Sequence, residues 1–398
     1  MKKVLAVVLA SVLALSLVAC ASKQEKAEAA VEKAVEAEAA AEEAAEAAVE
    51  AVADAAADLK TVKFCLTRSA EVLEDTPFWA AQNCGYLAEE GLTIEMIETY
   101  GTTDCKMVAT GQADFAVPGP SLILQSIDEG LPIKVVEAYD AINIWGLCVL
   151  NDSPYQTFAD IAGAQEKYGR KLTVALGDAS WESLVTPTLI AAGINPAEDL
   201  EFVVAGDNRF VQVAEGNLDI LFSWPGEAYQ LIGQNYDFKY LDGNEVLQTN
   251  SNSIITNLDH IENDPELVTK FTRALAKGIY FCKLNPEAAA AVSCDQWPNI
   301  DVTWKAAVYV QSGRVYQMFG PEGGADEAKI LEKIGYNWED KWLLNVDVMY
   351  DAGIISRKLT CDEIFTNDLL DLNWDRKEVE DDAANYDWKT TAARYPAE

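Results

Sequence analysis

Histidine is almost absent from this sequence, and its scarcity excludes several kinds of active site. His260 is the single histidine among 398 residues. It precedes the polar run Asn263, Asp264 and Pro265, so we expect it in an exposed turn. A zinc site made of several histidines is therefore not expected, and neither is a Ser-His-Asp or Cys-His nucleophile. We predict no catalytic residue, no metal site and no cofactor.

Basic residues are also scarce. Lys and Arg total 30 against 65 Asp and Glu, which gives a formal net charge of −35. Proteins that bind nucleic acid or an anionic membrane surface present an excess of positive charge. Neither partner is expected for this chain.

Residues 21–58 contain no proline, no glycine and no aromatic residue, and consist almost only of Ala, Glu, Val and Lys. Such a segment cannot form a hydrophobic core. Ala and Glu favour helix, so we predict a tether over residues 21–60 that is either a semi-rigid helical spacer or disordered. A partner-binding coiled coil is the alternative, although its apolar positions would nearly all be alanine.

Paired cysteine motifs are missing as well. The eight cysteines include no C-x-x-C spacing. If Cys20 carries lipid, an odd number remains, and at least one thiol stays unpaired. Cys282 and Cys294 form the one pair that we would test as a disulfide.

The N-terminus has the pattern of a bacterial lipoprotein export signal. Lys2 and Lys3 precede an apolar run over residues 4–18, followed by Ala19 and Cys20. The run is shorter than the roughly 17 residues that span a bilayer, and no basic cluster follows it as a stop-transfer signal. The alternative is a plain transmembrane helix. We predict that residues 1–20 are the signal, that Cys20 is lipidated, and that the protein is anchored to the outer face of the cytoplasmic membrane.

After Lys60 short apolar runs alternate with helical patterns, which indicates an α/β fold. The second half of the chain repeats the order of predicted strands and helices in the first half. The repeat includes a local motif: Gly111, Asp114 and an apolar triplet before Pro118 are matched by Gly216, Asp219 and a triplet before Pro225. We predict two lobes, each a mainly parallel sheet flanked by helices. Lobe 1 comprises residues 61–150 and 251–398, including extra C-terminal helices, and lobe 2 comprises residues 151–250.

Ligands of parallel α/β sheets bind beyond the carboxyl ends of the strands, so a cleft between the lobes is the expected site. Two chain crossings can serve as its hinge. Three kinds of residue follow the predicted strands: polar groups at helix starts, aromatic rings and carboxylates, the last opposed only by Arg68 and Arg209. The candidate ligand-binding residues are Trp79, Gly119, Ser121, Tyr139, Asp178, Ser180, Trp181, Asp207, Trp224 and Glu227.

Helix starts favour anionic or strongly accepting groups, although Ser121 and Ser180 could equally be helix caps. The aromatic rings suit a planar ligand, and core packing is the alternative for each of them. The carboxylates would repel a simple oxyanion. We therefore favour a nitrogen-containing aromatic solute over a sulfonate or nitrate.

Several stretches together resemble a known family. They are Pro77–Ala81, Gly85–Leu92, Gly111 with Asp114 and Phe115, Gly130–Pro132, Gly193–Pro196 and Gly216–Asp219. Residues 61–300 are similar to solute-binding proteins of the nitrate, sulfonate, taurine and thiamine-pyrimidine group, which includes NMT1/THI5-like and SsuA/TauA-like proteins.

The resemblance implies a type II periplasmic-binding-protein fold. It also implies a protein that captures a small solute, performs no chemistry on it and presents it to the permease subunits of an ABC importer. We expect this protein to be a monomer and not an enzyme. The favoured solute is a thiamine-precursor pyrimidine or another nitrogen heterocycle, and the alternatives are an alkanesulfonate, taurine or nitrate. The group also contains thiamine pyrimidine synthases, which use a cysteine-rich motif and histidines. This chain lacks that cysteine cluster and has one histidine, so an enzyme of that kind fits less well.

Overall fold

The computed structural model describes residues 59–66, 73–99 and 102–397. The chain divides into two compact units, Met1–Lys60 and Thr61–Glu398, and the second unit contains the folded lobes. The expected signal with Cys20, the expected tether up to residue 58, and Arg68 lie outside the described residues. Among the residues that are described, no helix combines the length and apolar character needed to cross a membrane.

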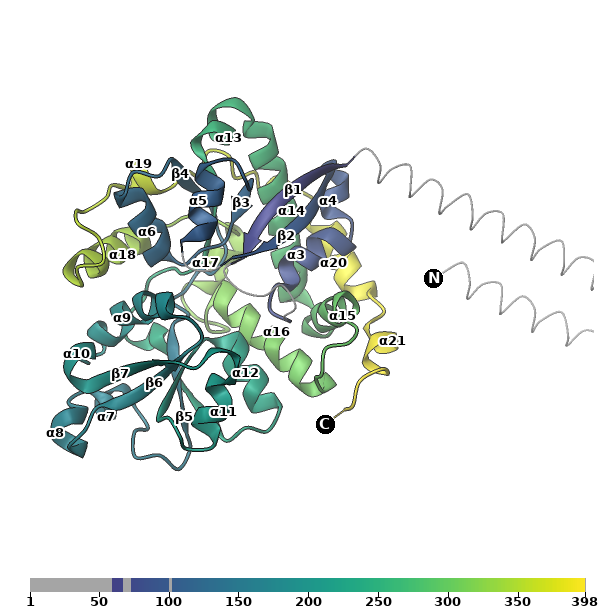
Figure 1. Ribbon diagram of the computed structural model, residues 1–398. Coiled ribbons are helices and arrows are strands. Elements are labelled where there is room, and N and C mark those ends of the chain that lie inside the picture. The colour runs from purple at the N-terminus through teal and green to yellow at the C-terminus, as the bar shows by residue number, and fades with distance from the viewer. Residues whose placement is uncertain (1–58, 67–72, 100–101, 398) are drawn as a thin grey trace, which may run out of the picture. The chain divides into compact units, whose positions relative to one another are not determined.

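The first lobe is built on a five-stranded sheet in the order β2-β1-β3-β10-β4 (Figure 1). β1 and β3 are parallel, whereas β10 runs antiparallel to both β3 and β4. In that spatial order the strands are β2 (Leu92–Glu98), β1 (Lys60–Leu66), β3 (Phe115–Ala116), β10 (Ser253–Asn257) and β4 (Ile133–Ala138).

The second lobe repeats this design in a sheet of order β7-β6-β8-β5-β9. β6 is parallel to β7 and β8, and β5 is antiparallel to β8 and β9. The strands are β7 (Leu200–Val204), β6 (Leu172–Leu176), β8 (Ile220–Ser223), β5 (Gly146–Leu150) and β9 (Phe238–Leu241). Residues 146–150, which the sequence-based boundaries assign to lobe 1, are thus a strand of the second sheet.

The predicted two-lobed α/β architecture is confirmed, and each sheet also contains one strand that runs antiparallel to both of its neighbours. The reversed strands are the ones that follow the two chain crossings, β5 after Ile144 and β10 after Asn252. A chain that arrives from the other lobe enters its sheet from the opposite end. The crossing strands therefore pair antiparallel to their neighbours.

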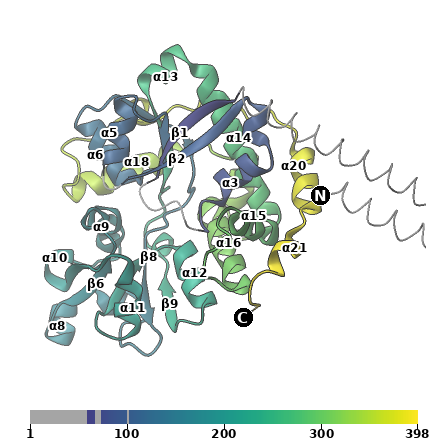
Figure 2. The ribbon, with the colours of Figure 1, turned by 45° about the vertical axis from the view of Figure 1, so that its right-hand side comes forward.

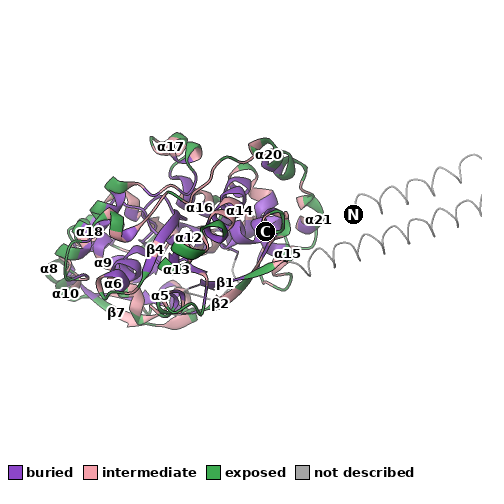
Figure 3. Ribbon diagram, turned by 90° about the horizontal axis from the view of Figure 1, so that it is seen from above, coloured by how far each residue is buried: buried purple, intermediate pink, exposed green. Residues whose placement is uncertain are grey.

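Helices of the first lobe cover its sheet and extend past it at the C-terminal end (Figure 2). They are α3 (Thr76–Asn83), α4 (Tyr86–Glu89), α5 (Thr103–Ala109), α6 (Pro120–Asp128), α13 (Leu258–Asn263), α14 (Pro265–Leu284), α15 (Pro286–Gln296), α16 (Trp304–Phe319), α17 (Glu327–Glu332), α18 (Glu339–Asp351), α19 (Cys361–Ile364), α20 (Arg376–Asn385) and α21 (Trp388–Ala392). The outer helices α17 and α20 carry most of their exposed residues on the side away from the core (Figure 3).

Shorter helices surround the second sheet. They are α7 (Phe158–Ile161), α8 (Ala164–Tyr168), η1 (Ala179–Trp181), α9 (Glu182–Ala191), α10 (Pro196–Asp199), η2 (Gly206–Asn208), α11 (Arg209–Ala214), α12 (Pro225–Gly233) and η3 (Gly243–Glu245).

The long helix α14 shows how local sequence sets the fold. Asp264 caps its start by accepting a hydrogen bond from Leu267 N, and Pro265 occupies the first turn, where no amide donor is needed. Asn285 ends the helix and caps α15 in turn. On its buried face, Phe271 stacks on Phe115 of β3 at 4.2 Å and on Phe64 of β1 at 5.7 Å. These aromatic contacts join the helix to the centre of the first sheet.

The repeated motif has the same structural role in both lobes. Asp114 precedes β3 and accepts a hydrogen bond from Lys63 N of β1 at 2.8 Å. Asp219 precedes β8 and accepts one from Thr173 N of β6 at 2.8 Å. Each carboxylate thus fixes the register of two neighbouring parallel strands, which supports a common architecture for the two lobes.

His260 lies in helix α13, not in an exposed turn as expected. Its Nε2 is 3.1 Å from Asp114 Oδ1, and its ring stacks on Phe115. The expectation failed because Asn257 caps the segment by accepting from His260 N, which starts a helix before the polar run.

Cysteines in the described residues are all free thiols, and Cys282 and Cys294 are not joined. The two belong to different parts of the core. Cys282 belongs to the core that α14 forms with the first sheet. Cys294 belongs to a separate cluster that includes Leu73 and Val302.

Candidate ligand-binding site

A cavity of about 570 Å³ lies between the two lobes of the folded unit. Its walls come from both lobes, from the two chain crossings and from α16. The lining residues are Glu74, Gly119, Leu122, Ile144, Trp145, Ser180, Trp181, Leu184, Phe222, Trp224, Asn252, Arg314 and Gln317.

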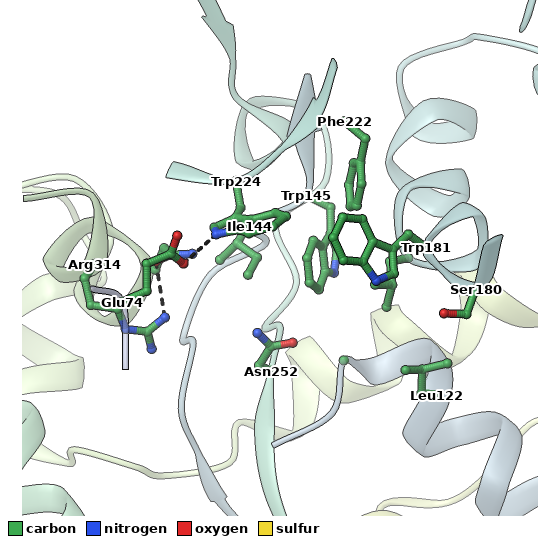
Figure 4. Close-up of a pocket in the computed structure, with 13 residues that line it drawn as sticks. Glu74, Leu122, Ile144, Trp145, Ser180, Trp181, Phe222, Trp224, Asn252 and Arg314 are labelled. Atoms are coloured by element: carbon green, nitrogen blue, oxygen red, sulfur yellow. Dashed lines mark hydrogen bonds between the residues drawn. The ribbon is translucent and has the colours of Figure 1, made fainter. Parts of the chain in front are cut away.

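Aromatic rings form one side of the cavity (Figure 4). Trp181 meets Trp224 edge to face at 5.7 Å and Phe222 at 5.9 Å. Trp145 lies 5.7 Å from Phe222 as well. The Trp181 ring packs closely against Gly177, where an added Cβ would lie 2.5 Å from the ring. Glycine at that position is what allows the indole to reach its place.

Behind these rings an ion pair supports them. The Arg209 guanidinium lies 5.0 Å from the centre of the Trp181 ring and 5.8 Å from that of Trp224, and it pairs with Glu227. Glu227 also accepts a hydrogen bond from Ser223 Oγ at 2.8 Å. Burial raises the pKa of Glu227, and the positive charge of Arg209 opposes that rise. The pair holds the tryptophans and does not line the cavity.

The opposite side of the cavity is polar. Glu74, from the segment before α3, accepts a hydrogen bond from the Trp224 indole N–H at 2.5 Å (Figure 4). This bond links the first lobe to the start of α12. Arg314 of α16 is buried, pairs with Asp140 at 2.6 Å and lies over the Tyr139 ring at 4.0 Å. Its charge is therefore neutralised within the protein.

The structure brings four of the predicted site residues to the cavity: Gly119, Ser180, Trp181 and Trp224. Ser180 also donates to Asp178, and that carboxylate caps the short helix η1. Asp178 itself is outside the lining, and Asp207 is exposed on η2.

Four further candidates lie away from the cavity for reasons of packing. Trp79 is buried against Trp297, edge to face at 5.6 Å. Tyr139 stacks on Phe78 at 5.0 Å beneath Arg314. Ser121 is fully buried with its hydroxyl 3.4 Å from that of Ser183, and Glu227 supports the tryptophans as described above.

Several lining residues were not among the sequence candidates. They are Glu74, Leu122, Ile144, Trp145, Leu184, Phe222, Asn252, Arg314 and Gln317. For Arg314 a signal existed: Gln311, Arg314 and Gln317 recur every three residues in an otherwise apolar stretch, which places three polar groups on one face of a helix. For Asn252 the signal was its position at a chain crossing.

Comparisons with known proteins agree with this architecture. The sequence model of the family described as NMT1/THI5 like matches residues 73–289. The chain is 24% identical over 313 residues to the riboflavin-binding protein RibY of Chloroflexus aurantiacus, covering 75% of this chain and 83% of that protein. It is 21% identical over 304 residues to the formylaminopyrimidine-binding protein of Halalkalibacterium halodurans, covering 74% and 89%.

Among solved structures, the periplasmic nitrate-binding protein NrtA from Synechocystis PCC 6803 has a similar fold. The TM-score is 0.58 at 14% sequence identity, over 86% of this chain and 92% of NrtA. The two-lobed fold is therefore that of the periplasmic binding proteins. Because the family model spans more than half of the sequence, the chain belongs to the NMT1/THI5-like family.

Proposed function

We propose that this chain is the solute-binding lipoprotein of an ABC importer and that it captures a planar nitrogen heterocycle between its lobes. The observation that carries the proposal is the aromatic side of the cavity, which Trp145, Trp181 and Trp224 line together. Indole rings offer flat apolar faces, and a flat ring of the ligand gains dispersion and stacking energy against them.

Charge in the cavity disfavours a simple oxyanion. The Glu74 carboxylate lines the cavity, while the one guanidinium among the lining residues, that of Arg314, is paired with Asp140. A nitrate or sulfonate would bring a second negative charge near Glu74 without an uncompensated cation to bind it. A neutral or weakly basic ring avoids this repulsion.

The relatives support the same class of ligand. Their names state binding of riboflavin and of formylaminopyrimidine. Both compounds contain a pyrimidine ring, although riboflavin fuses it into a larger flat system. A binding protein of this kind performs no chemistry on its ligand, so the proposed function is that of a receptor and not of an enzyme.

The remaining parts of the proposal concern location. Lipidation of Cys20 would hold the protein at the outer face of the cytoplasmic membrane, since a lipoprotein anchor carries more than one acyl chain. Residues 21–60 would then act as a tether between the lipid and the lobes. We propose that the protein works as a monomer and delivers its solute to the permease subunits.

A thermal-shift screen tests this function. A ligand that binds only the folded state raises the melting temperature by mass action. We expect a saturable rise with riboflavin or a substituted aminopyrimidine, and none with nitrate, taurine or an alkanesulfonate. A rise with nitrate or a sulfonate alone would contradict the proposed ligand class.

A further inference from the structure

We propose that Asn252 determines which heterocycle is accepted, by pairing its side-chain amide with an edge of the ring that has an N–H donor beside an acceptor. This inference rests on the proposed function and names the chemistry that the cavity selects. It concerns a residue at the second chain crossing, where the main chain returns to the first lobe just before β10.

The Asn252 side chain is enclosed by the protein but is not bonded to it. Its exposed fraction is 7%, and it lines the cavity. In Figure 4 the amide points up into the space below the indoles. Within the described part of the chain, no side chain or backbone group is hydrogen-bonded to that amide, although its own backbone carbonyl accepts from Tyr139 N and Asp140 N. Because the amide faces the cavity and has no partner in the described protein, its polar groups are available to a ligand.

Two of the polar neighbours of Asn252 are hydrogen-bonded within the protein, whereas the buried Ser251 hydroxyl donates to no group among the described residues. Residues 249–253 form a run of five buried polar residues. Asn250 accepts a hydrogen bond from Asn345 Nδ2 at 3.0 Å, and the Ser253 hydroxyl donates to Ser251 O at 3.1 Å. Of the five residues in this run, Asn252 is the one that lines the cavity.

The usual structural reasons for an asparagine do not apply at this position. Asparagine tolerates left-handed backbone conformations, but the non-glycine residue with a positive φ in the described chain is Asn235. Asparagine also caps helices, as Asn257 does for α13, whereas the Asn252 side chain caps none of the described helices. A role toward a ligand accounts for the residue where a role in the fold does not.

The main chain around Asn252 fixes the amide in place. Its carbonyl accepts two backbone hydrogen bonds, at 3.1 Å from Tyr139 and 2.9 Å from Asp140, and Ser253 N donates to Pro118 O. Gly119 lies beside it: a Cβ there would be 3.4 Å from Asn252 Oδ1 and 3.2 Å from the Trp145 ring. The amide and the indole wall thus meet at one corner of the cavity, where a stacked ring would present its edge.

The geometry of an amide defines the edge that it can bind. Asn252 offers one acceptor, Oδ1, next to one donor, Nδ2, so a complementary edge needs a donor next to an acceptor. A ring imide provides this pair as N–H and C=O, and an aminopyrimidine provides it as an exocyclic N–H and a ring nitrogen. Asparagine reads adenine by the same two-bond pairing. A sulfonate has only acceptors, so it cannot donate a hydrogen bond to Asn252 Oδ1.

Calorimetric titration of the full chain with paired ligands tests this assignment. The pairs are riboflavin with N3-methylriboflavin, and 4-amino-2-methylpyrimidine with its N,N-dimethylamino analogue. In each pair methylation removes the donor and keeps the flat ring. For whichever ring binds, we expect methylation to weaken affinity by at least about tenfold, because Oδ1 is left unsatisfied. The responding pair shows whether the edge is an imide or an amine.

The variant Asn252→Leu keeps the approximate size of the side chain and removes both polar groups. It should bind the parent ring more weakly and lose the preference over the methylated one. The matched control is Asn250→Leu, on the same crossing but outside the cavity, which should retain the preference even if its melting temperature falls.

Two results would overturn the inference, and they are distinguishable. If the wild-type protein binds a ring but Asn252→Leu keeps the full preference for the unmethylated ligand, Asn252 does not read the edge while the proposed function stands. If the wild-type protein binds none of the rings, the proposed function itself fails, and this inference fails with it.

Discussion

Trp224 connects the two sides of the cavity through a single hydrogen bond. Its ring contacts Trp181, and its indole N–H donates to Glu74 at 2.5 Å. A tryptophan can serve both purposes because it combines a broad apolar face with one polar donor. We therefore regard the orientation of this ring as set jointly by lobe 1 and lobe 2.

Replacement of Trp224 separates these two contributions. Trp224→Ala removes the face and the donor, and we expect affinity for a ring ligand to fall by about tenfold or more. Trp224→Phe keeps a face but leaves Glu74 without the indole, so we expect an intermediate loss. Trp388→Ala is the control, since Trp388 stacks on Trp304 outside the cavity. Wild-type affinity in Trp224→Ala, measured by calorimetry, would refute the stacking role.

Asp104 makes the stability of the fold depend on pH, whether or not a ligand is bound. Burial raises the pKa of this carboxyl to about 7, and hydrogen bonding from Cys105 N opposes the rise. A carboxyl whose pKa is higher in the folded state stabilises the fold at low pH, and this contribution is lost as pH rises toward 7. Asp104→Asn removes the buried charge, so its stability relative to wild type should increase between pH 4 and pH 8 by at least about 1 kcal/mol.

Chemical denaturation of both proteins at the two pH values measures this difference directly. The comparison cancels the other titrating groups, which are the same in both proteins. A difference in the free energy of unfolding that does not change with pH would show that Asp104 titrates at its ordinary value in the fold.

Single residues also show where prediction from sequence stops. Trp79 and Trp181 were both candidate walls of the site, with core packing as the alternative for each. In the structure Trp79 lies on a helix buried over residues 76–81, whereas Trp181 lies on a short turn of η1 beside the cavity. Which face of a ring is covered depends on packing partners far along the chain, such as Trp297, and periodicity does not reveal them.

At the scale of elements, the contact between α12 and α16 ties the two lobes together. Gly313 of α16 faces the start of α12, where a Cβ would approach Pro225 O to 2.5 Å. A second close approach lies at Gly233, which faces Ala306. The two helices pack backbone to backbone, and Trp224 and Arg314, which flank the cavity, are adjacent to this contact.

Gly313→Ala should force the two helices apart. Overpacking of this kind costs roughly 1–3 kcal/mol, and we expect the free energy of unfolding to fall by that amount in a urea titration. Ring affinity should fall as well, because the helix start that holds Trp224 shifts. The exposed neighbour Ser312→Ala should change stability by less than about 0.5 kcal/mol. Unchanged stability in Gly313→Ala would show that the contact is loose.

The sequence predicted the elements better than their pairing. Helical patterns and the repeated Gly and Asp motif placed the strands and helices near their observed positions. What it missed was the strand direction of β5 and β10 and the role of α16, which was assigned only to the C-terminal helices of lobe 1 and which also lines the cavity. Local sequence carries propensity and period, whereas strand direction depends on the path that the chain takes between lobes.

For the molecule as a whole, the proposed N-terminal export signal bears on where the lobes operate. The proposed anchor at Cys20 would keep the binding domain near a permease and raise its local concentration there. The strongly negative net charge of −35 is consistent with a binding domain that stays clear of anionic lipid.

The anchor can be tested in cells by metabolic labelling with a fatty acid. The wild-type chain should incorporate label, and Cys20→Ser should incorporate none, because the thioether cannot form. Cys361→Ser keeps Cys20 while removing another cysteine, so it should be labelled like wild type. Labelling of the Cys20→Ser chain would contradict the lipoprotein assignment.

The central claim is that a flat nitrogen heterocycle binds in the cavity between the lobes, and a crystal structure of the complex tests it most directly. The predicted result is a ring stacked against Trp181 or Trp224, with its donor and acceptor edge on the Asn252 amide. A ligand found outside this cavity, or an oxyanion bound within it at Arg314, would contradict the account.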